Sequence, residues 1–423
     1  MSLRLIVVDP GHFHCALVQK EMYPNVDPTV HVYAPVGPDL LDYLDRIVRF
    51  NTRAEAPTRW RLEVHAGEDF LDRLARERPG DVAVFSGRNA GKIQRIAAAI
   101  DAGLNVLADK PWIIRAEDLP LLEQVLRKAQ ERGLIAYDLM TGRHDVMNIV
   151  QAALHADSEV FGEQLAGSPV EPGVAVDSVH HILKQVAGAP NPRPPWFFDV
   201  AQQGVTLSDI GTHLIDRVHL TLFPDQAIDR AELRILGGER WSTAVRAPQF
   251  TQVTGTRAWP EFLAPHVHDD VLEYPCNSRL LYHVRGVHVA MEMRWDWESA
   301  GGDTHTAVYR GSRARIELRQ GPAQGWRPEL FVVPQADIGA ALQRRIAALA
   351  PAHPGLAAER SGGEWHVAVP DALRIGHDAH FAALARKFLD HVEYRRPLPA
   401  WERPNMLAKY WLCTEGVARA VLR

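Results

Sequence analysis

The first third of the 423-residue chain alternates short apolar runs with segments of helical periodicity. Several of the runs, such as Asp81–Phe85 (DVAVF), are almost continuously apolar, which is typical of parallel strands buried on both faces. Repeated strand–helix units therefore predict an α/β fold with a doubly wound parallel sheet. The predicted strands are Leu3–Val8, Thr29–Tyr33, Arg61–His65, Asp81–Phe85, Asn105–Ala108 and Leu134–Tyr137. The helices predicted between them include His14–Met22, Asp69–Arg76 and Leu119–Ala129.

The middle of the chain has a different pattern, with strands in hairpin-like pairs such as the pair around Gly286. This pattern predicts a large, mostly antiparallel open sheet flanked by helices. Its predicted strands are Asp177–Lys184, Ala231–Leu236, Ser278–Arg285, Val287–Trp295, Ala307–Arg310 and Ala314–Arg319. Two helices are predicted to close the chain, and 423 residues are enough for two domains. We place the boundary after residue 142, so that the two domains are residues 1–142 and 143–423.

Composition and charge exclude several functional classes. The net charge of −5 offers no basic surface for nucleic acid or an anionic membrane. The chain contains no run approaching ~18 apolar residues, so no membrane span is expected, and the N-terminal apolar run is too short for a signal peptide. The three cysteines are far apart in the sequence, which favours a reducing compartment. We therefore expect a cytoplasmic location.

A proton-transfer group is indicated by the segment that contains Asp209, His213 and Asp216. Their spacing of i, i+4 and i+7 places all three on one face of a helix. A packing face would carry Leu or Ile at these positions. Histidine titrates near neutral pH and a carboxylate can orient it, so this face can hold a catalytic acid or base.

The first strand–helix turn, DPGHFHCA, has three interpretations. A dinucleotide-binding turn would read G-x-G-x-x-G, and only Gly11 of that pattern is present. Alternatively, Asp9, His12 and His14 resemble the metal-binding opening of an amidohydrolase barrel, although the later strand ends offer poor zinc ligands. In the third interpretation, the histidines only line the turn and bond to backbone or phosphate.

Lys110 follows the fifth predicted strand. Ligands of doubly wound sheets bind at the carboxyl ends of the strands, so this position favours a functional role over that of a surface lysine. His180 and His181 are expected on opposite faces of one strand, so at most one of them would face a site. The group His266, His268, Asp269 and Asp270 is expected in a solvated loop, and Trp295 and Trp297 in packing. We predict no metal site.

Together these features resemble the glucose–fructose oxidoreductase and inositol dehydrogenase family (Gfo/Idh/MocA). That family usually carries Glu-Lys-Pro after the fifth strand, where this chain has Asp109–Pro111. The family's D-x-G-x-H-x-x-D element matches fully at Asp209–Asp216. Its T-P-N-like turn corresponds to Ser86–Asn89, and its W-R pair to Trp196 and Phe197. The opening D-P-G-H-F-H resembles a less-characterised branch of the family.

The resemblance implies a Rossmann domain, a C-terminal substrate and oligomerisation domain, and closing helices (about 377–423) that pack back towards the Rossmann domain. It implies an NAD(P)-dependent oxidoreductase acting on a secondary alcohol or ketone of a sugar, glycoside or polyol. His213 would be the base, Lys110 would stabilise the alkoxide, and Asp209 would orient the imidazole. The implied cofactor-binding residues are Asp9, Gly11, His12, Phe13, His14, Tyr33, Ser86, Gly87, Asn89, Asp109, Lys110 and Pro111. The candidate substrate contacts are Trp112, Arg143, His181, Lys184, Trp196, Asp209 and His213.

NAD is favoured over NADP, because Tyr33 stands where an acidic residue often binds the adenosine ribose and no arginine follows it closely. The resemblance also implies a homodimer or homotetramer with a small-molecule substrate. Three alternatives stay open: a glycosidase or lyase that oxidises its substrate transiently, a non-catalytic nucleotide-binding sensor of the same fold, and a zinc amidohydrolase.

Overall fold

The structure is a computed structural model that describes residues 2–186 and 189–423. The chain divides into two compact units. The first unit comprises Met1–Thr141, Pro194–Gly204 and His377–Arg403. The second comprises Gly142–Arg193, Val205–Gly376 and Pro404–Arg423. Two segments from later in the sequence therefore complete the first unit.

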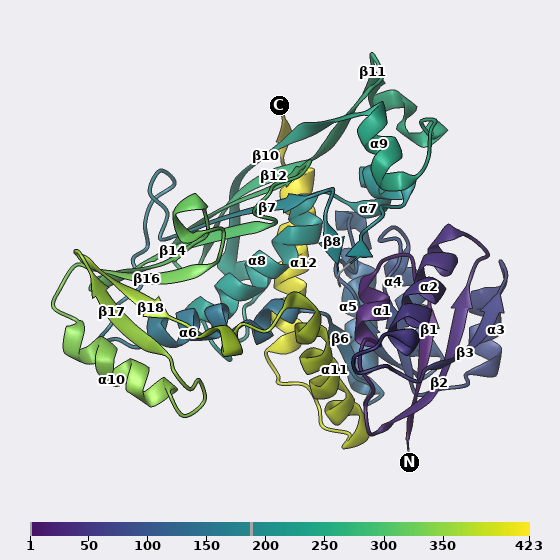
Figure 1. Ribbon diagram of the computed structural model, residues 1–423, viewed down its shortest axis with the longest axis horizontal. Helices are drawn as coiled ribbons and strands as arrows, with labels where there is room; N and C mark the ends of the chain where they lie inside the picture. The colour runs from purple at the N-terminus through teal and green to yellow at the C-terminus, as the bar shows by residue number, and fades with distance from the viewer. Residues whose placement is uncertain (1, 187–188) are drawn as a thin grey trace. The chain divides into compact units, whose positions relative to one another are not determined.

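The first unit is built on a parallel six-stranded sheet with the order β3-β2-β1-β4-β5-β6 (Figure 1). The strand order reverses between β1 and β4, and this switch point is where doubly wound sheets bind ligands. The predicted α/β class is confirmed. The open sheet is not a barrel, which removes the amidohydrolase alternative. The strands are β1 (Leu3–Val8), β2 (Val26–Ala34), β3 (Arg61–Ala66), β4 (Val82–Phe85), β5 (Asn105–Ala108) and β6 (Ala136–Asp138).

Helices cover this sheet in two groups, and within each group neighbouring helices contact one another (Figure 1). One group consists of α3 (Phe70–Glu77), α4 (Lys92–Asp101) and α5 (Leu119–Glu131). The other consists of α1 (His14–Val18), α2 (Pro38–Thr52) and α11 (His377–Glu393). The short helices η3 (Pro195–Phe198) and α7 (Val200–Gln203) belong to the same unit.

Helix α1 ends at Val18, four residues before the predicted end at Met22. Two side chains take the carbonyls that a longer helix would use. The Tyr23 hydroxyl donates to the Val18 carbonyl at 2.6 Å, and the Trp60 indole N–H donates to the Gln19 carbonyl at 2.7 Å. Because these partners come from outside the helix, local periodicity could not predict where it stops.

The second unit contains an eleven-stranded sheet among the described residues, with the order β17-β18-β16-β15-β14-β7-β13-β12-β10-β19 and β11 paired to β12. Its pairs are antiparallel except β7 with β13 and β10 with β19, which confirms the mostly antiparallel prediction. The strands are β7 (Val174–His181), β10 (Leu233–Arg246), β11 (Val267–His268), β12 (Val271–Val284), β13 (Val287–Asp296), β14 (Thr304–Arg310), β15 (Ala314–Arg319), β16 (Glu329–Pro334), β17 (Ala357–Ser361), β18 (Glu364–Ala368) and β19 (Val421–Leu422). The two-residue strands β8 (Gln185–Val186) and β9 (Ala189–Pro190) form a separate pair.

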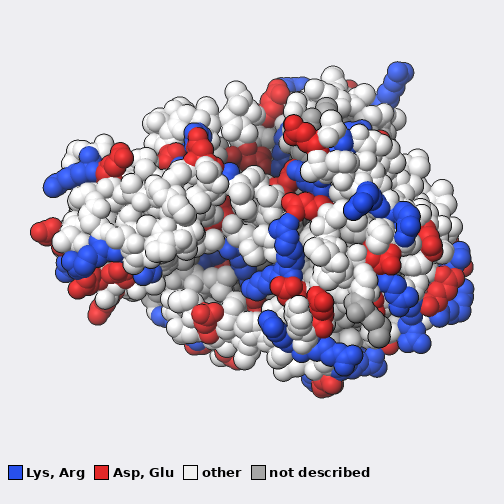
Figure 2. Space-filling model, turned by 60° about the horizontal axis from the view of Figure 1, so that its bottom comes forward, with Lys and Arg blue, Asp and Glu red and all other residues white. Residues whose placement is uncertain are grey.

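Helices α6 (Val146–His155) and α8 (Thr206–Leu222) pack along one face of the large sheet (Figure 1). Gly211 permits the close approach of α8, because a Cβ there would lie 3.2 Å from the sulfur of Met293 on β13. The remaining helices are α9 (Ala247–Thr254), α10 (Gly339–Leu349) and α12 (Glu402–Ala418). Among the described residues, no helix has the length and apolar character needed to cross a membrane. Figure 2 shows acidic and basic side chains intermixed on one face of the molecule, as expected for a net charge of −5.

Candidate active site

The first turn differs from a glycine-rich turn at two of the three glycine positions. Aligned on G-x-G-x-x-G, Asp9, Gly11 and His14 occupy the three glycine positions. Asp9 has a φ of +47°, in the left-handed region that favours glycine. The amide of His12 donates to the Ser86 carbonyl at 2.8 Å, which holds the turn against the end of β4. A side chain at Gly87 is excluded, because its Cβ would lie 2.1 Å from the Asp9 carbonyl oxygen.

Gly11 lies under two side chains from elsewhere in the same unit. A Cβ at residue 11 would lie 2.9 Å from Asp39 Oδ2 and 3.3 Å from Trp196 Cζ2. The Trp196 indole donates to Asp39 Oδ2 at 2.9 Å, and the Arg88 guanidinium lies 5.8 Å from the indole centroid. Burial raises the pKa of Asp39. Close packing with Asp39 and Trp196 therefore explains the glycine at residue 11, independently of any phosphate.

Asp109, at the end of β5, gathers the two histidines of the first turn. Its Oδ2 lies 2.9 Å from His12 Nδ1, and its Oδ1 lies 2.9 Å from His14 Nδ1. Ser86 Oγ also donates to Asp109 Oδ2, at 3.2 Å. Burial opposes ionisation of Asp109, but the histidine contacts outweigh it and hold its pKa well below the usual range. Burial lowers the pKa of His14, so we take His14 as a neutral donor to an ionised carboxylate.

Two lysines lie beside this cluster. Lys110 is 7% exposed and close enough to lower the pKa of both His14 and Lys92 by its charge. Lys92 Nζ donates to Asn89 Oδ1 at 2.6 Å and to the Asp109 carbonyl at 3.0 Å. Burial lowers the pKa of Lys92 to about 8. Two buried lysines therefore lie beside the ionised Asp109 at the carboxyl ends of β4 and β5, next to the switch point.

In the second unit, helix α8 carries the predicted face of Asp209, His213 and Asp216. Asp209 and Asp216 are buried, whereas His213 is partly exposed. Asp216 accepts a bidentate pair from Arg143, at 2.6 and 2.7 Å, and lies 3.6 Å from Lys409 Nζ. Burial opposes this ionisation, but both cations together lower the pKa of Asp216 to about 2. Asp216 therefore supports the structure, and Arg143, a candidate substrate contact, is engaged in that support.

Asp303 forms a second histidine–carboxylate cluster in this unit, just before β14. Lys184 Nζ donates to Asp303 Oδ2 at 2.6 Å, and both His180 Nδ1 and His181 Nδ1 lie 3.4 Å from its oxygens. Asp209 is near enough to act on the pKa of Lys184, which burial lowers. His180 and His181 are consecutive residues of β7, paired with Trp295 and Asp296 of β13, yet both reach the oxygens of Asp303 at the end of the strand.

Two other predicted contacts lie in the protein interior. Trp112 is fully buried, and its indole donates to the Ala108 carbonyl at 3.2 Å, so it offers no surface to a substrate. Tyr33 is also fully buried; its ring stacks on His65 and its hydroxyl donates to Glu77. The sequence places Tyr33 where an acidic residue often binds the adenosine ribose, whereas its hydroxyl bonds to Glu77, the last residue of α3. Phe13 is buried beside both histidines of the turn.

Comparison with known proteins places the chain in a family. Residues 150–421 match the family described as "Putative oxidoreductase C terminal domain". The structure of a "putative oxidoreductase" from Parabacteroides merdae is 41% identical, covers 99% of this chain and 97% of its own, and superposes with a TM-score of 0.95. The chain belongs to this oxidoreductase family. No curated protein matches it.

More distant structures share the fold of the oxidoreductase. GenD2 from gentamicin A biosynthesis, solved with NAD, is 17% identical over 99% of this chain and 94% of its own, with a TM-score of 0.59. KijD10, a 3-ketoreductase from Actinomadura kijaniata solved with NADP and TDP-benzene, is 18% identical over 100% and 99%, with a TM-score of 0.58.

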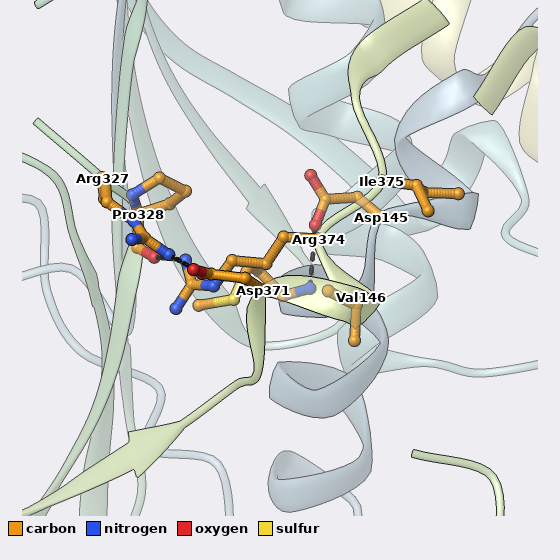
Figure 3. Close-up of a pocket in the computed structure, with 8 residues that line it drawn as sticks. Asp145, Val146, Arg327, Pro328, Asp371, Arg374 and Ile375 are labelled. Atoms are coloured by element: carbon orange, nitrogen blue, oxygen red, sulfur yellow. Dashed lines mark hydrogen bonds and ion pairs between the residues drawn. The ribbon is translucent and has the colours of Figure 1, made fainter. Parts of the chain in front are cut away.

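The second unit of the oxidoreductase contains a pocket of about 350 Å³ (Figure 3). Arg327 and Arg374 contribute positive charge and Asp145 and Asp371 negative charge, so the lining is balanced. Asp145 caps α6 by accepting from Met147 N, and Arg327 pairs with Asp371. None of the predicted site residues lines this pocket.

Sequence reasoning missed three charged residues of the oxidoreductase that contact predicted ones: Asp39, Lys92 and Asp303. Asp39 lies in the first turn of α2 and Lys92 is the first residue of α4, positions where a charged residue is usually solvated. Asp303 follows Gly301 and Gly302 in a turn, and nothing local distinguishes it from other turn acids. The group expected in a solvated loop is exposed, although part of it has regular structure. His266 ends a short helix, His268 lies on β11, and Asp269 and Asp270 form the turn that follows.

Proposed function

We propose that this oxidoreductase is a Gfo/Idh/MocA-type enzyme that uses NAD(P) to interconvert a secondary alcohol and a ketone on a sugar, glycoside or polyol. One observation carries the proposal: the buried Lys110 follows β5 of a sheet with the order β3-β2-β1-β4-β5-β6, beside its switch point. The distant structures with NAD and NADP, and the 3-ketoreductase activity in the name of one, support the cofactor and the substrate class.

The residues at this sheet edge fit a dinucleotide, although not in the usual way. Asp9 takes the left-handed backbone of the first glycine, and Gly11 is retained. The third glycine is replaced by His14, which is tied to Asp109. We propose that the backbone from Gly11 to Phe13, the partly exposed His12, the Ser86–Asn89 loop and Pro111 hold the pyrophosphate and nicotinamide ribose. Arg88, 51% exposed beside Trp196, is an added candidate for a phosphate contact. NAD is kept as the favoured cofactor of this proposal because no arginine follows Tyr33 closely.

When bound, the nicotinamide supplies hydride exchange with the substrate carbon. His213 Nδ1 or Nε2 would take the hydroxyl proton, since it is the partly exposed member of its helix face. Lys110 would stabilise the negative charge that develops on the substrate oxygen. The buried Asp209 would hold His213 or a substrate hydroxyl, and Lys184, His181 and Trp196 would contact the substrate.

The test is hydride transfer measured as NADH absorbance over a panel of sugars, glycosides and polyols. We expect Lys110→Ala and His213→Ala to lower kcat by about 10²–10⁴. The exposed His268→Ala serves as the control and should keep its rate. Full hydride transfer in either active-site variant would overturn the assignment.

The same assay separates the alternatives. Product formation without accumulation of NADH would indicate transient oxidation in a glycosidase or lyase. Nucleotide binding without turnover of any panel member would indicate a sensor. Light scattering on the purified chain would test the predicted dimer or tetramer.

A further inference from the structure

A second group of metal-ligating side chains lies on the first unit, at the edge of its sheet. His31 on β2 is paired in register with Glu63 on β3, and Tyr33 with His65 two residues later. In parallel strands such partners project from the same face, so His31, Glu63 and His65 form one cluster. β3 is the edge strand of the sheet, and the cluster shares no residue with the proposed active site.

The ligand atoms of this cluster are close together and incompletely bonded. One donor atom from each of the three residues lies within 4.8 Å of the others. His31 Nδ1 is 3.2 Å from Glu63 Oε2, without the geometry of a hydrogen bond. Both His31 Nδ1 and His65 Nε2 are buried and have no hydrogen-bond partner. Buried nitrogens of this kind carry a desolvation cost that a bound ligand would remove.

The histidine cluster at Asp109 differs in this respect. There, each histidine Nδ1 faces its own carboxylate oxygen at 2.9 Å, so the donors are already satisfied. Lys92 and Lys110 also act on that cluster with positive charge, which disfavours a cation. Around His65 the nearby charged groups are Glu63, Glu77 and Arg73, which sum to one negative charge.

We propose that His31, Glu63 and His65 bind a divalent transition-metal ion, with zinc as the best match. Two imidazoles and one carboxylate are a common zinc donor set, and a water can supply the fourth ligand because the Glu63 side chain is 57% exposed. Donors of a tetrahedral zinc ion lie about 3.4 Å apart, so rotation of side chains suffices to close the site. The ion would join the edge strand β3 to its neighbour β2.

The experiment uses the full chain, treated with a chelator and then titrated with ZnCl₂ by calorimetry. We expect the wild type to bind one equivalent of zinc and His65→Ala to bind none. Binding of zinc by Glu63→Gln should be weaker by about tenfold or more. Zinc should raise the Tm of the wild type but not that of His65→Ala. Mg²⁺ is a hard ion that prefers oxygen ligands, so it should not raise the Tm of the wild type. The exposed His268→Ala, in the other unit, should keep the equivalent.

Each other outcome overturns the proposal. No zinc uptake by the wild type, or retention of the equivalent in both His65→Ala and Glu63→Gln, excludes this site. Loss of the equivalent in Asp109→Asn alone would assign the ion to the first turn instead. If His65→Ala fails to fold, Glu63→Gln decides, because an exposed glutamate can be replaced without a packing change.

Discussion

Each unit of this oxidoreductase places one carboxylate between two histidines, and the two clusters differ in burial and charge. The Asp109 side chain is 4% exposed, and its contacts are two imidazoles and the Ser86 hydroxyl. The Asp303 side chain is 30% exposed and also pairs with Lys184. The same residue types therefore form a buried cluster that joins the first turn to the end of β5 in one unit, and a solvent-accessible charged cluster in the other.

This difference indicates separate roles. Asp109 connects the first turn to the end of β5 across 97 positions of sequence, so it determines the shape of the proposed cofactor turn. Asp303 keeps Lys184 and the end of β7 in place while still exposed to solvent, which suits contact with a polar ligand. Three measurements test whether the two clusters differ in this way.

The largest expected effect is on stability in the buried cluster. Asp109→Asn removes the charge that accepts from both histidines and should lower the unfolding free energy by about 3–5 kcal/mol, measured by urea denaturation. The matched control is Asp81→Asn, an acid of the same unit whose side chain is 40% exposed, with a change of about 0.5 kcal/mol. A loss below about 1 kcal/mol for Asp109→Asn would contradict a buried, ionised Asp109.

The second effect is a difference in pH dependence. The pKa of His14 is lowered in the folded state, so the unfolded chain binds the proton first and stability falls as pH drops below about 6.5. The slope from one such group reaches about 1.4 kcal/mol per pH unit. The pKa of Asp303 is also lowered: burial opposes ionisation, but the histidine and lysine contacts outweigh it. Its contribution is therefore present above about pH 3.9 and lost only below it.

Between pH 6.5 and 4, the Asp109 cluster should therefore lose stability and the Asp303 cluster should not. Unfolding free energies across this range should show a smaller slope in His14→Gln than in the wild type. The buried His219, whose pKa burial lowers to about 3, adds a similar slope that remains in this variant. An unchanged slope in His14→Gln would contradict a neutral His14.

The smallest effect is expected at the accessible cluster. Asp303→Asn should cost about 1 kcal/mol, because solvent screens a pair that is partly exposed. The cost should shrink further in 1 M salt, where the Debye length is about 3 Å, whereas the cost of Asp109→Asn should change little. Equal salt dependence of the two variants would remove the distinction between a buried and an accessible cluster.

Much of the fold was predictable because strand and helix signals are local. The run Asp81–Phe85 became β4 (Val82–Phe85), and Val287–Trp295 became β13 (Val287–Asp296). The helix that carries Asp209, His213 and Asp216 was also predicted, since its spacing repeats with the helical period. By contrast, the strand predicted at Ala231–Leu236 is β10 (Leu233–Arg246), because pairing with β12 along its whole length outweighs its weak local signal.

The site was less predictable, because it depends on contacts between distant residues. Trp112 follows the strand end beside Lys110, yet its indole donates to the Ala108 carbonyl, whereas Lys110 acts by its charge on His14 and Lys92. His180 and His181 both reach Asp303, although strand alternation separates them. Asp303 itself lies 122 positions from His181, so no local pattern could connect them.

The two sheet types, the helix with the histidine–aspartate face and the lysine at a strand end could be predicted from local patterns, since each depends on the period of neighbouring residues. Which histidines pair with which acids depends instead on the folded chain. The turn histidines are satisfied by Asp109, whereas His31 Nδ1 and His65 Nε2 remain without hydrogen-bond partners. The physical reason is that burial and hydrogen bonding depend on neighbours in space, and strand register and loop packing choose those neighbours.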